Sequence, residues 1–378
     1  MYHVNMRDAV IVGGGNAGIA AAACLKRVGV SASVLERGDR VGMSWHDRYD
    51  SLRLNSWRPL SGQPYMRIPR SLGPWPSKTA YRDFLDDFTR SEGLDVRFGC
   101  KVERIWYQDG LWHVTVNGID TTYPNVVIAT GRWRVPVIPN WPGCEHFAGS
   151  LIHSSEYRNA KDYQNRDVLV VGGGNSALEI ATDLASTSAS VTVSIRRPPA
   201  LFPQSFLGLN AHLLVFLTSR LPARLMDIAL WTSSYVLYHD LIRIGFAPSP
   251  RRAITSLKTT GQLPPVDRGI SDSLRSGLIA VAPAIRSISE TGVHFTDGSH
   301  RRYNVIIAAT GYRTGLSEFL EAPGVLDADQ IPRSHAPDAA APGLFFIGFR
   351  PGVTGQMRES ARDARQLARV WNRCAVVR

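Results

Sequence analysis

Cysteine is scarce in this sequence. The 378 residues include four cysteines, which lie far apart at Cys24, Cys100, Cys144 and Cys374. Because no Cys-x-x-Cys pair is present, the pattern argues against a disulfide framework, a zinc site and a dithiol redox centre. Isolated cysteines suit a reducing compartment, so we expect a cytoplasmic protein.

The sequence also lacks a long hydrophobic run. The N-terminal apolar segment AVIVGGG is too short for the core of a secretory signal, so we expect no leader. An uncharged stretch at residues 198–219 is interrupted by three prolines and by polar side chains, which argues against a membrane span. A peripheral membrane contact by the helices that follow this stretch stays open.

Acidic residues are fewer than basic ones. The chain has 32 Asp and Glu against 43 Lys and Arg, a formal net charge of +11. The basic residues are scattered and no nucleic-acid-binding motif accompanies them, so we expect no nucleic-acid partner. The excess of positive charge suits anionic small molecules such as dinucleotides.

The chain does contain an internal repeat. Residues 8–14, 16–29 and 31–37 read as strand, helix and strand, and residues 166–173, 175–187 and 189–197 repeat this order. Two near-duplicate strands, 125–131 and 304–311, each end in Ala-Thr-Gly. The alternation predicts an α/β fold with two Rossmann-like dinucleotide-binding domains.

The segment 212–245 reads as two mostly apolar helices broken at Pro222. Core packing explains this pattern as well as a cap over a substrate site does. Aromatic residues in and before these helices favour an apolar or aromatic ligand, although buried helices would look the same: Phe202, Phe206, Phe216, Trp231 and Tyr235.

The first glycine motif is Gly13-x-Gly15-x-x-Gly18, placed between a strand and a helix. Such glycines allow a tight turn, close approach of a pyrophosphate and close helix–strand packing, and the helix N-terminus attracts the phosphates. Glu36 follows 23 residues after Gly13, where a carboxylate accepts hydrogen bonds from an adenosine ribose. The motif predicts a dinucleotide site.

The second motif, Gly172-x-Gly174-x-x-Ala177, has the same context. The position that matches Glu36 is Ile195, and Arg196 and Arg197 follow it. Guanidinium groups pair with a 2′-phosphate, which a carboxylate would repel, so this site is predicted to take NADPH. Arginines that merely end a strand are the alternative. Together the two motifs predict a flavoprotein that binds FAD and takes hydride from NADPH.

Three other functions share this architecture. A pyridine nucleotide–disulfide reductase would need a redox cysteine pair, which this chain lacks. A reductase or oxidase that passes electrons to a quinone, a protein or O₂ without oxygenating a substrate remains open. A nucleotide-binding redox sensor also remains open.

The segment Phe147–Tyr157, FAGSLIHSSEY, has the spacing Phe-x-Gly-x-x-x-His-x-x-x-Tyr and stands just before the second glycine motif. It resembles the fingerprint of the class B flavin-dependent monooxygenases. Further matching segments are GMSWHDRYDSLRLNS, LPPVDRG, ATGYR, both Ala-Thr-Gly strands and the C-terminal GLFFIGF and GQMRESARDARQLA. The resemblance covers nearly the whole chain and is closest to the flavin-containing monooxygenase and indole-3-pyruvate monooxygenase branch, in its bacterial form.

This resemblance implies a discontinuous FAD domain, residues 1–147 and 306–378, and an inserted NADPH domain, residues 148–305, with a helical cap at about 205–245. It also implies that reduced FAD reacts with O₂ to give a C4a-(hydro)peroxide, which passes one oxygen atom to a small organic substrate. Oxygenation of nitrogen or sulfur and oxidative decarboxylation of a 2-oxo acid are both open, as is the oligomeric state.

The resemblance and the glycine motifs together give the candidate site residues. Asn55 is the first catalytic candidate: it is expected beside the flavin, where its amide could hydrogen-bond the peroxide or the nicotinamide ribose, and a loop Asn in an Asx turn is the alternative. His153 is expected to act either as an acid–base group or, more in keeping with its position in the fingerprint, as an organiser of the linker with Phe147, Gly149 and Tyr157. The positions expected to contact FAD are Gly13, Gly15, Asn16, Ala17, Gly18, Glu36, Arg37, Ser44, Trp45, Val102, Ala129, Thr130, Gly131, Gly348, Thr354 and Gln356. The remaining cofactor positions, which belong to the second motif and the second Ala-Thr-Gly strand, are Gly172, Gly174, Asn175, Ser176, Ala177, Arg196, Arg197, Ala309, Thr310 and Gly311.

Overall fold

A computed structural model describes residues 8–206, 209–246, 252–261, 264–335 and 341–376. The chain forms two compact units. Unit 1 comprises Met1–His46, Ser56–Val135 and Tyr312–Arg378, and unit 2 comprises Asp47–Asn55 and Pro136–Gly311. The α/β class and the pair of parallel, Rossmann-like sheets that the sequence predicts are confirmed.

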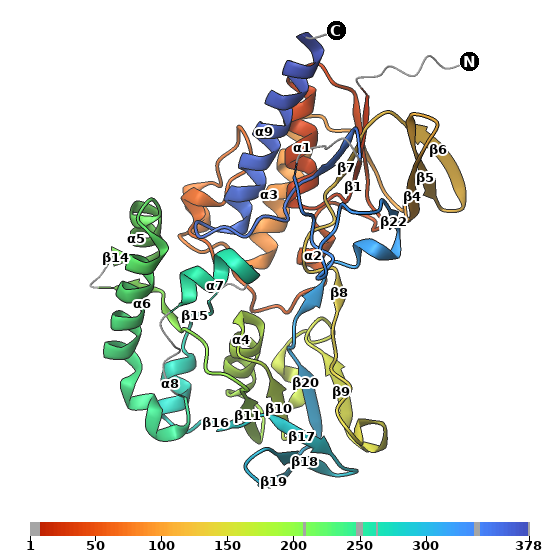
Figure 1. The fold of residues 1–378 in the computed structure, drawn as a ribbon. Coiled ribbons are helices and arrows are strands. Elements are labelled where there is room, and N and C mark those ends of the chain that lie inside the picture. Colours follow the sequence, from red (N-terminus) through yellow and green to blue (C-terminus); the bar gives the residue numbers. More distant parts are fainter. Residues whose placement is uncertain (1–7, 207–208, 247–251, 262–263, 336–340, 377–378) are drawn as a thin grey trace. The chain divides into compact units, whose positions relative to one another are not determined.

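Unit 1 contains a parallel sheet in the order β23-β7-β1-β2-β3. Its strands are β1 (Ala9–Val12), β2 (Ala32–Leu35), β3 (Val96–Arg97), β7 (Val126–Ile128) and β23 (Leu344–Phe346). The helices α1 (Asn16–Lys26) and α9 (Gln356–Val376) lie side by side (Figure 1). Their contact consists of Ala20 and Cys24 against Ala364 and Ala368, and these small side chains let the two helices approach closely.

A second, four-stranded sheet of unit 1 has the order β22-β4-β5-β6, and its strands β4 to β6 form an antiparallel meander. Trp112 is fully buried beneath it, and its indole N–H donates to the carbonyl of Pro342. The bounds in this part of unit 1 are α2 (Met43–His46), α3 (Lys78–Ser91), β4 (Val102–Gln108), β5 (Leu111–Val116), β6 (Ile119–Tyr123) and β22 (Leu320–Glu321).

Unit 2 contains the second parallel sheet, in the order β16-β11-β10-β20-β9. A β-branched core of this sheet packs on α4 (Asn175–Leu184), which explains why its strands read as continuous apolar runs. The strands are β9 (Ser150–His153), β10 (Asp167–Val171), β11 (Ser190–Ser194), β16 (Ile279–Ala282) and β20 (Val305–Ala308), and an antiparallel sheet adds β17 (Ile285–Ile288), β18 (Gly292–Phe295) and β19 (His300–Arg302).

The two apolar helices broken at Pro222 are also confirmed. They are α5 (Ala211–Thr218) and α6 (Ala223–Tyr238), and Pro222 stands at the position before α6, where its missing N–H costs nothing. The neighbouring elements of unit 2 are β12 (Phe202–Pro203), β13 (Ser205–Phe206), β14 (Leu209–Asn210), the 3₁₀ segment His239–Ile244, α7 (Ala253–Thr260), β15 (Val266–Asp267) and α8 (Ile270–Arg275).

The chain passes between the units at 135/136 and 311/312, near the short strands β8 (Val135–Pro136) and β21 (Tyr312–Arg313). The sequence placed these limits at 147/148 and 305/306. Residues 136–147 group with unit 2 because Trp141, Cys144 and Phe147 pack on one of its cores. The segment Asp47–Asn55 also joins unit 2, which the sequence did not indicate. Which cofactor each unit holds stays a proposal.

Both parallel sheets contain the same glycine turn. Gly13 has φ +108°, and a Cβ on it would lie 2.9 Å from the carbonyl oxygen of Ala129; at Gly172, with φ +138°, the distance to the carbonyl oxygen of Ala309 would be 2.5 Å. Each turn therefore runs directly against the end of an Ala-Thr-Gly strand. A side chain at either position would force these backbones apart.

Alanine substitutions at two glycines of the first turn are expected to differ in their effect on the free energy of unfolding. A Cβ on Gly18 would overlap the carbonyl oxygen of Gly13, whereas nothing lies within 4 Å of the position for a Cβ on Gly15, whose φ of −79° suits any residue. We expect Gly18→Ala to lower the free energy of unfolding of the ligand-free protein by roughly 1–3 kcal/mol, the usual cost of overpacking. The matched control Gly15→Ala should unfold like the unmodified protein in urea. Equal effects of the two substitutions would contradict this account of the turn.

Candidate functional site

The face of the first turn is open where a ligand would approach it. Gly15 stands at the start of α1, and apart from Gly15 and its chain neighbours no atom of the described residues lies within 4 Å of the place that a Cβ on it would occupy. No acidic residue lies in the first turn of α1. The exposed N–H groups and the helix dipole therefore offer an uncontested site for an anion.

Glu36 directly follows β2, beside this turn, and is buried, with 7% of its surface exposed. Its Oε2 accepts a hydrogen bond from the backbone N–H of Gly14 (2.7 Å), and its Oε1 accepts one from Gly38 (2.8 Å). The two bonds fix the carboxylate and leave each oxygen further lone pairs. Hydroxyl groups of a ribose are donors that these lone pairs can accept.

Asn16, the first residue of α1, is held from the side. Its Oδ1 accepts hydrogen bonds from Gln63 Nε2 and from the hydroxyl of Tyr81, both at 2.6 Å. Tyr81 is fully buried, which raises the pKa of its hydroxyl, so it stays a donor. The ring of Trp45 packs edge-on against Tyr81 at 4.7 Å. Asn16 is thus committed to the protein through its oxygen, and Trp45 belongs to the same cluster.

The C-terminal positions meet the turn through α9. A Cβ on Gly348, which has φ +82°, would lie 2.7 Å from the Cβ of Ala17, and Gln356 Nε2 donates to the carbonyl of Gly348 (2.8 Å). Thr354 Oγ1 donates to Glu359 (3.1 Å). The start of α9 is therefore held against the start of α1.

Seven buried side-chain polar atoms of unit 1 have no hydrogen-bond partner among the described residues, and two of them bear on the turn. One is Oγ1 of Thr130, in the first Ala-Thr-Gly strand; the other is Oδ2 of Asp363, on α9. Burial raises the pKa of Asp363 to about 6, although Arg350 lies 3.6 Å away. The sequence indicated Thr130 as a candidate site residue. It did not indicate Asp363, because nothing in the helical pattern of α9 distinguishes this residue from its neighbours.

All sixteen positions that the sequence assigned to FAD lie in unit 1. Five of these positions remain to be described. Ala129 hydrogen-bonds through its N–H to Val12, Gly131 has φ +77° and open space beside it, and Ser44 lies in α2. Arg37 is exposed after Glu36, and Val102 opens β4, so these two have no described contact with the turn.

The second turn repeats this geometry in unit 2. Gly174 stands at the start of α4 with φ −90°, and nothing lies within 4 Å of a Cβ built on it. Asn175 is committed to the protein, since its Oδ1 accepts from the N–H of Val266 (3.0 Å). Ala177 is fully buried, and its Cβ would lie 3.4 Å from a Cβ on Gly172. The open Gly174 and the free start of α4 form a second anion site.

The end of β11 distinguishes this turn from the first. Ile195 is buried, and its Cγ2 would lie 3.5 Å from a Cβ on Gly173. It occupies the position beside Gly173 that Glu36 occupies beside Gly14 in unit 1. Arg196 and Arg197 follow and are exposed. The carboxylate is therefore replaced by an apolar side chain with two cations next to it.

His153, at the end of β9, is 1% exposed and bonded on both sides of its ring. Nδ1 accepts from the backbone N–H of Ser155 (3.1 Å), which makes Nε2 the donor to the carbonyl of Gly311 (3.0 Å). Burial lowers the pKa of the imidazole, so the neutral form is favoured. This geometry favours a positioning role for His153 at the end of the strand that carries Ala309, Thr310 and Gly311.

The other fingerprint residues have packing roles. A Cβ on Gly149 would overlap the carbonyl oxygen of Asn304, and its space is filled by the ring of Phe147. Tyr157 is fully buried and donates its hydroxyl to Asp183 (2.7 Å), while burial raises the pKa of the phenol. The fingerprint spacing thus serves the pairing of β9 with β20.

Asn55 ends the segment Asp47–Asn55 beside a buried polar cluster. Glu179, on α4, accepts from the hydroxyl of Tyr49 (2.7 Å), and its Oε1 lies 3.9 Å from Nε of Arg268. Arg268 also donates to the carbonyl of Leu54 (2.5 Å), and Asn55 hydrogen-bonds to Glu179. Burial raises the pKa of Glu179 against these partners.

Oδ1 of Asn55 is itself buried with no partner among the described residues, so it is a candidate ligand-binding atom. Ser176, expected at the cofactor, hydrogen-bonds to Tyr49 in the same cluster. The sequence missed Tyr49, Glu179 and Arg268. Arg268 and Tyr49 had a signal, because they lie in the LPPVDRG and GMSWHDRYDSLRLNS segments.

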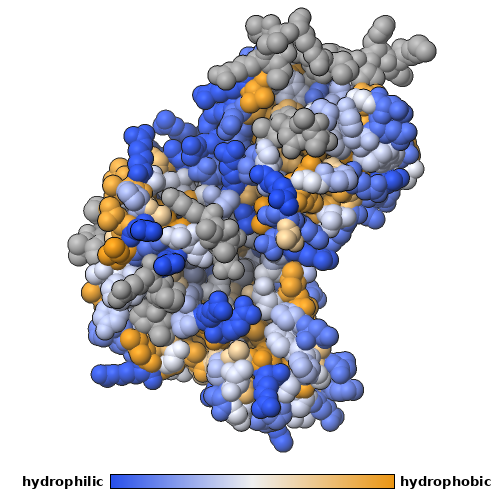
Figure 2. Space-filling view, viewed as in Figure 1, coloured by the Kyte–Doolittle hydropathy of each residue, from blue (hydrophilic) through white to orange (hydrophobic). Residues whose placement is uncertain are grey.

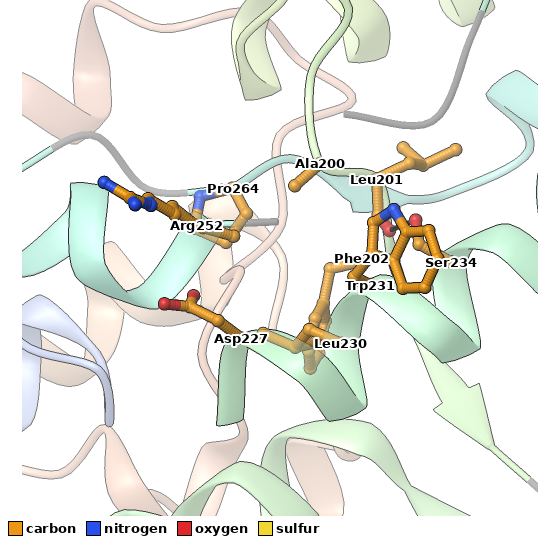
Figure 3. Close-up of a pocket in the computed structure, with 10 residues that line it drawn as sticks. Ala200, Leu201, Phe202, Asp227, Leu230, Trp231, Ser234, Arg252 and Pro264 are labelled. Carbon is orange, nitrogen blue, oxygen red and sulfur yellow. Dashed lines mark hydrogen bonds between the residues drawn. The ribbon is translucent and has the colours of Figure 1, made fainter. Parts of the chain in front are cut away.

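A small pocket lies between β12, α6 and α7 of unit 2 (Figure 3). Phe202, Leu230 and Trp231 form its apolar wall. Two charged groups line the wall. Asp227 is buried and accepts from the N–H of Ile254 (2.6 Å), whereas Arg252 is exposed. Of the predicted aromatic residues, Phe202 and Trp231 line this pocket, Tyr235 is 47% exposed, and the side chain of Phe206 lies outside the described residues.

The two open turns fit two dinucleotides. Each leaves a helix N-terminus clear for a pyrophosphate, and buried Thr130 Oγ1 and Asn55 Oδ1 are polar atoms that a ligand would satisfy. The described cysteines, Cys24, Cys100 and Cys144, are each free thiols, so among them no redox pair is present.

Comparisons with known proteins agree with this geometry. The model of the family described as "Pyridine nucleotide-disulphide oxidoreductase" matches residues 10–205, which include both turns. The indole-3-pyruvate monooxygenase YUCCA1 of Oryza sativa subsp. japonica is 32% identical over 372 residues, covering 96% of this chain and 92% of that protein. The probable indole-3-pyruvate monooxygenase YUCCA4 of Arabidopsis thaliana is 31% identical, with 96% and 90% covered.

Solved structures show the same fold. The flavin-containing monooxygenase from Stenotrophomonas maltophilia has a TM-score of 0.76 at 22% identity and covers 97% of this chain and 98% of its own. Cyclohexanone monooxygenase from Rhodococcus sp. Phi1, bound to NADP+, has a TM-score of 0.75 at 19% identity and covers 97% and 84%. The protein is an FAD-containing monooxygenase, and the chain belongs to the class B flavin-dependent monooxygenases, in the branch of the flavin-containing and indole-3-pyruvate monooxygenases.

Proposed function

We propose that the protein uses NADPH and O₂ to transfer one oxygen atom to a small, apolar or aromatic organic substrate, with FAD held by unit 1 and NADPH by unit 2. The observation that carries the proposal is the pair of open turns with different neighbours: Glu36 at one, Ile195 with Arg196 and Arg197 at the other. Bound FAD would supply the electron transfer and O₂ activation that no side chain provides.

The choice of NADPH over NADH rests on Arg196 and Arg197. Both are exposed at the end of β11, beside the turn that would hold the pyrophosphate. Guanidinium groups pair with a phosphate in bidentate geometry, and no carboxylate at position 195 opposes this. The Rhodococcus relative described as bound to NADP+ is consistent with the choice.

Within unit 2 we assign two roles. Asn55 would hydrogen-bond a ligand atom through its buried Oδ1, because Glu179 holds the other end of its amide. His153 would position the strand end Ala309–Gly311 through its bond to Gly311 rather than move a proton, because its ring nitrogens are both engaged.

The substrate class follows from the pocket and the relatives. Its wall of Phe202, Leu230 and Trp231 suits an apolar or aromatic molecule, and Arg252 suits an anionic group on it. A 2-oxo acid such as indole-3-pyruvate, which the names of the rice and Arabidopsis relatives specify for those proteins, meets both conditions. Amines and sulfides meet the first of these conditions, the fit to the apolar wall.

The arginine pair makes a direct prediction about cofactor choice. Replacing both, as Arg196→Ala with Arg197→Ala, should raise the KM for NADPH by about 10–100-fold, the value of one to two charge-assisted contacts, and leave the KM for NADH unchanged. Initial rates with each cofactor measure this. An Arg166→Ala variant, with its arginine before β10, is the control and should keep its preference. An unchanged NADPH preference in the double variant would overturn the 2′-phosphate assignment.

The monooxygenase reaction itself is tested with oxygen-18-labelled O₂. The FAD-loaded protein is given NADPH and a panel of amines, sulfides, ketones and aromatic 2-oxo acids, and each product is examined by mass spectrometry. One labelled oxygen atom in a product, formed in proportion to the NADPH consumed, is the expected result. If all NADPH consumption ends as hydrogen peroxide, or as reduced quinone when quinone is supplied, the protein is a reductase or oxidase instead.

A further inference from the structure

Exposed apolar side chains are concentrated in one part of unit 2. Of the fifteen large hydrophobic residues that are exposed among the described residues, eight fall between residues 217 and 244, in and between α5, α6 and the 3₁₀ segment after α6. They are Leu217, Leu221, Leu225, Ile228, Tyr235, Val236, Ile242 and Ile244, with 42–66% of their surfaces exposed. Figure 2 shows hydrophobic side chains gathered along the edge where α5 and α6 lie. We call these eight residues the α5–α6 surface.

The spacing on α6 shows that this exposure is one continuous face. Leu225, Ile228 and Tyr235 recur at intervals of three and seven, so they line one side of the helix, and Leu221 stands four residues before Leu225. The opposite side is occupied, because Met226, Asp227, Ser234 and Tyr238 are buried. The exposed side of α6 is therefore mostly apolar, with Thr232 as a polar residue between Ile228 and Tyr235, and single scattered surface residues do not explain this clustering.

Exposed basic residues outnumber exposed acidic ones around this surface. Arg220 and Arg224 are exposed at the start of α6, and Arg243 is exposed between Ile242 and Ile244 at the far end. The two acidic residues of the region are both engaged: Asp227 is buried against the start of α7, and Asp240 forms an ion pair with Arg275 (2.7 Å). The α5–α6 surface is thus apolar in the middle and positive at both ends.

We propose that the α5–α6 surface docks the protein onto an anionic phospholipid bilayer, with α6 lying in the plane of the headgroups. Apolar side chains would enter the acyl boundary while the flanking arginines contact lipid phosphates, as in interfacial amphipathic helices. Helix α6, with 16 residues including Arg224 and Asp227, is too short and too polar to span the bilayer. Among the described residues, no helix has the length and apolar character for a span.

The charges argue against a second copy of the chain as the occupant. A two-fold pairing of this face would repeat the same patch on both sides of the interface. Its one exposed acid, Asp240, is already paired with Arg275, so arginines would meet arginines with little to offset them. An anionic lipid surface satisfies both the apolar and the charged parts.

The test is flotation of the FAD-loaded protein with vesicles of phosphatidylcholine containing about one quarter phosphatidylglycerol. We expect the protein to float with these vesicles, to bind pure phosphatidylcholine more weakly, and to be released as salt is raised. The double variant Leu225→Asn with Ile228→Asn should lose about tenfold or more of the binding. Arg220→Gln with Arg224→Gln should lose binding to the anionic vesicles alone.

The matched control is Ile119→Asn with Leu278→Asn, which removes two apolar residues that are 69% and 57% exposed elsewhere. It should bind like the unmodified protein. Absence of binding by the unmodified protein would overturn the proposal, as would equal losses in the control and the α6 variant. Sedimentation velocity without vesicles checks the other occupant: a dimer that the α6 variant converts to a monomer would assign this surface to self-association instead.

Discussion

The structure depends on a close backbone contact made twice, between a glycine turn and the end of an Ala-Thr-Gly strand. Gly13 runs against the carbonyl of Ala129, and Gly172 runs against that of Ala309. Because the turn is pressed onto a neighbouring strand, the helix that follows begins with its N–H groups directed into open space at Gly15 or Gly174. The contact places a phosphate-sized anion site at the same strand end in each unit, and the functional assignment depends on those two sites.

The difference between the sites comes from the next strand of each unit. In unit 1 the second residue of the turn, Gly14, donates its N–H to Glu36, and this bond holds a carboxylate beside the turn. In unit 2 the neighbour of Gly173 is Ile195, which accepts nothing, and Arg196 and Arg197 reach solvent instead. The same backbone turn thus has different charged neighbours in the two units: a carboxylate in unit 1, and two arginines after an apolar side chain in unit 2.

The sequence predicted the parts that depend on residues close together in the chain. Glycine spacing, the Glu36 position and the helix break at Pro222 follow from local geometry and were readable. The cluster of Tyr49, Glu179 and Arg268 was not, since its members come from segments far apart in the chain and meet only because Asp47–Asn55 packs with unit 2. Likewise, the fingerprint indicated His153, but only the fold identifies Gly311 as its partner. Tertiary pairing of polar side chains leaves no periodic trace in a sequence.

The central claim is that the two turns bind different dinucleotides. A crystal structure of the protein grown with FAD and NADP+ tests it most directly. The account predicts the FAD pyrophosphate at the start of α1 with the ribose on Glu36, and the NADP+ pyrophosphate at the start of α4 with its 2′-phosphate on Arg196 or Arg197. FAD at the second turn, or a 2′-phosphate remote from both arginines, would contradict it.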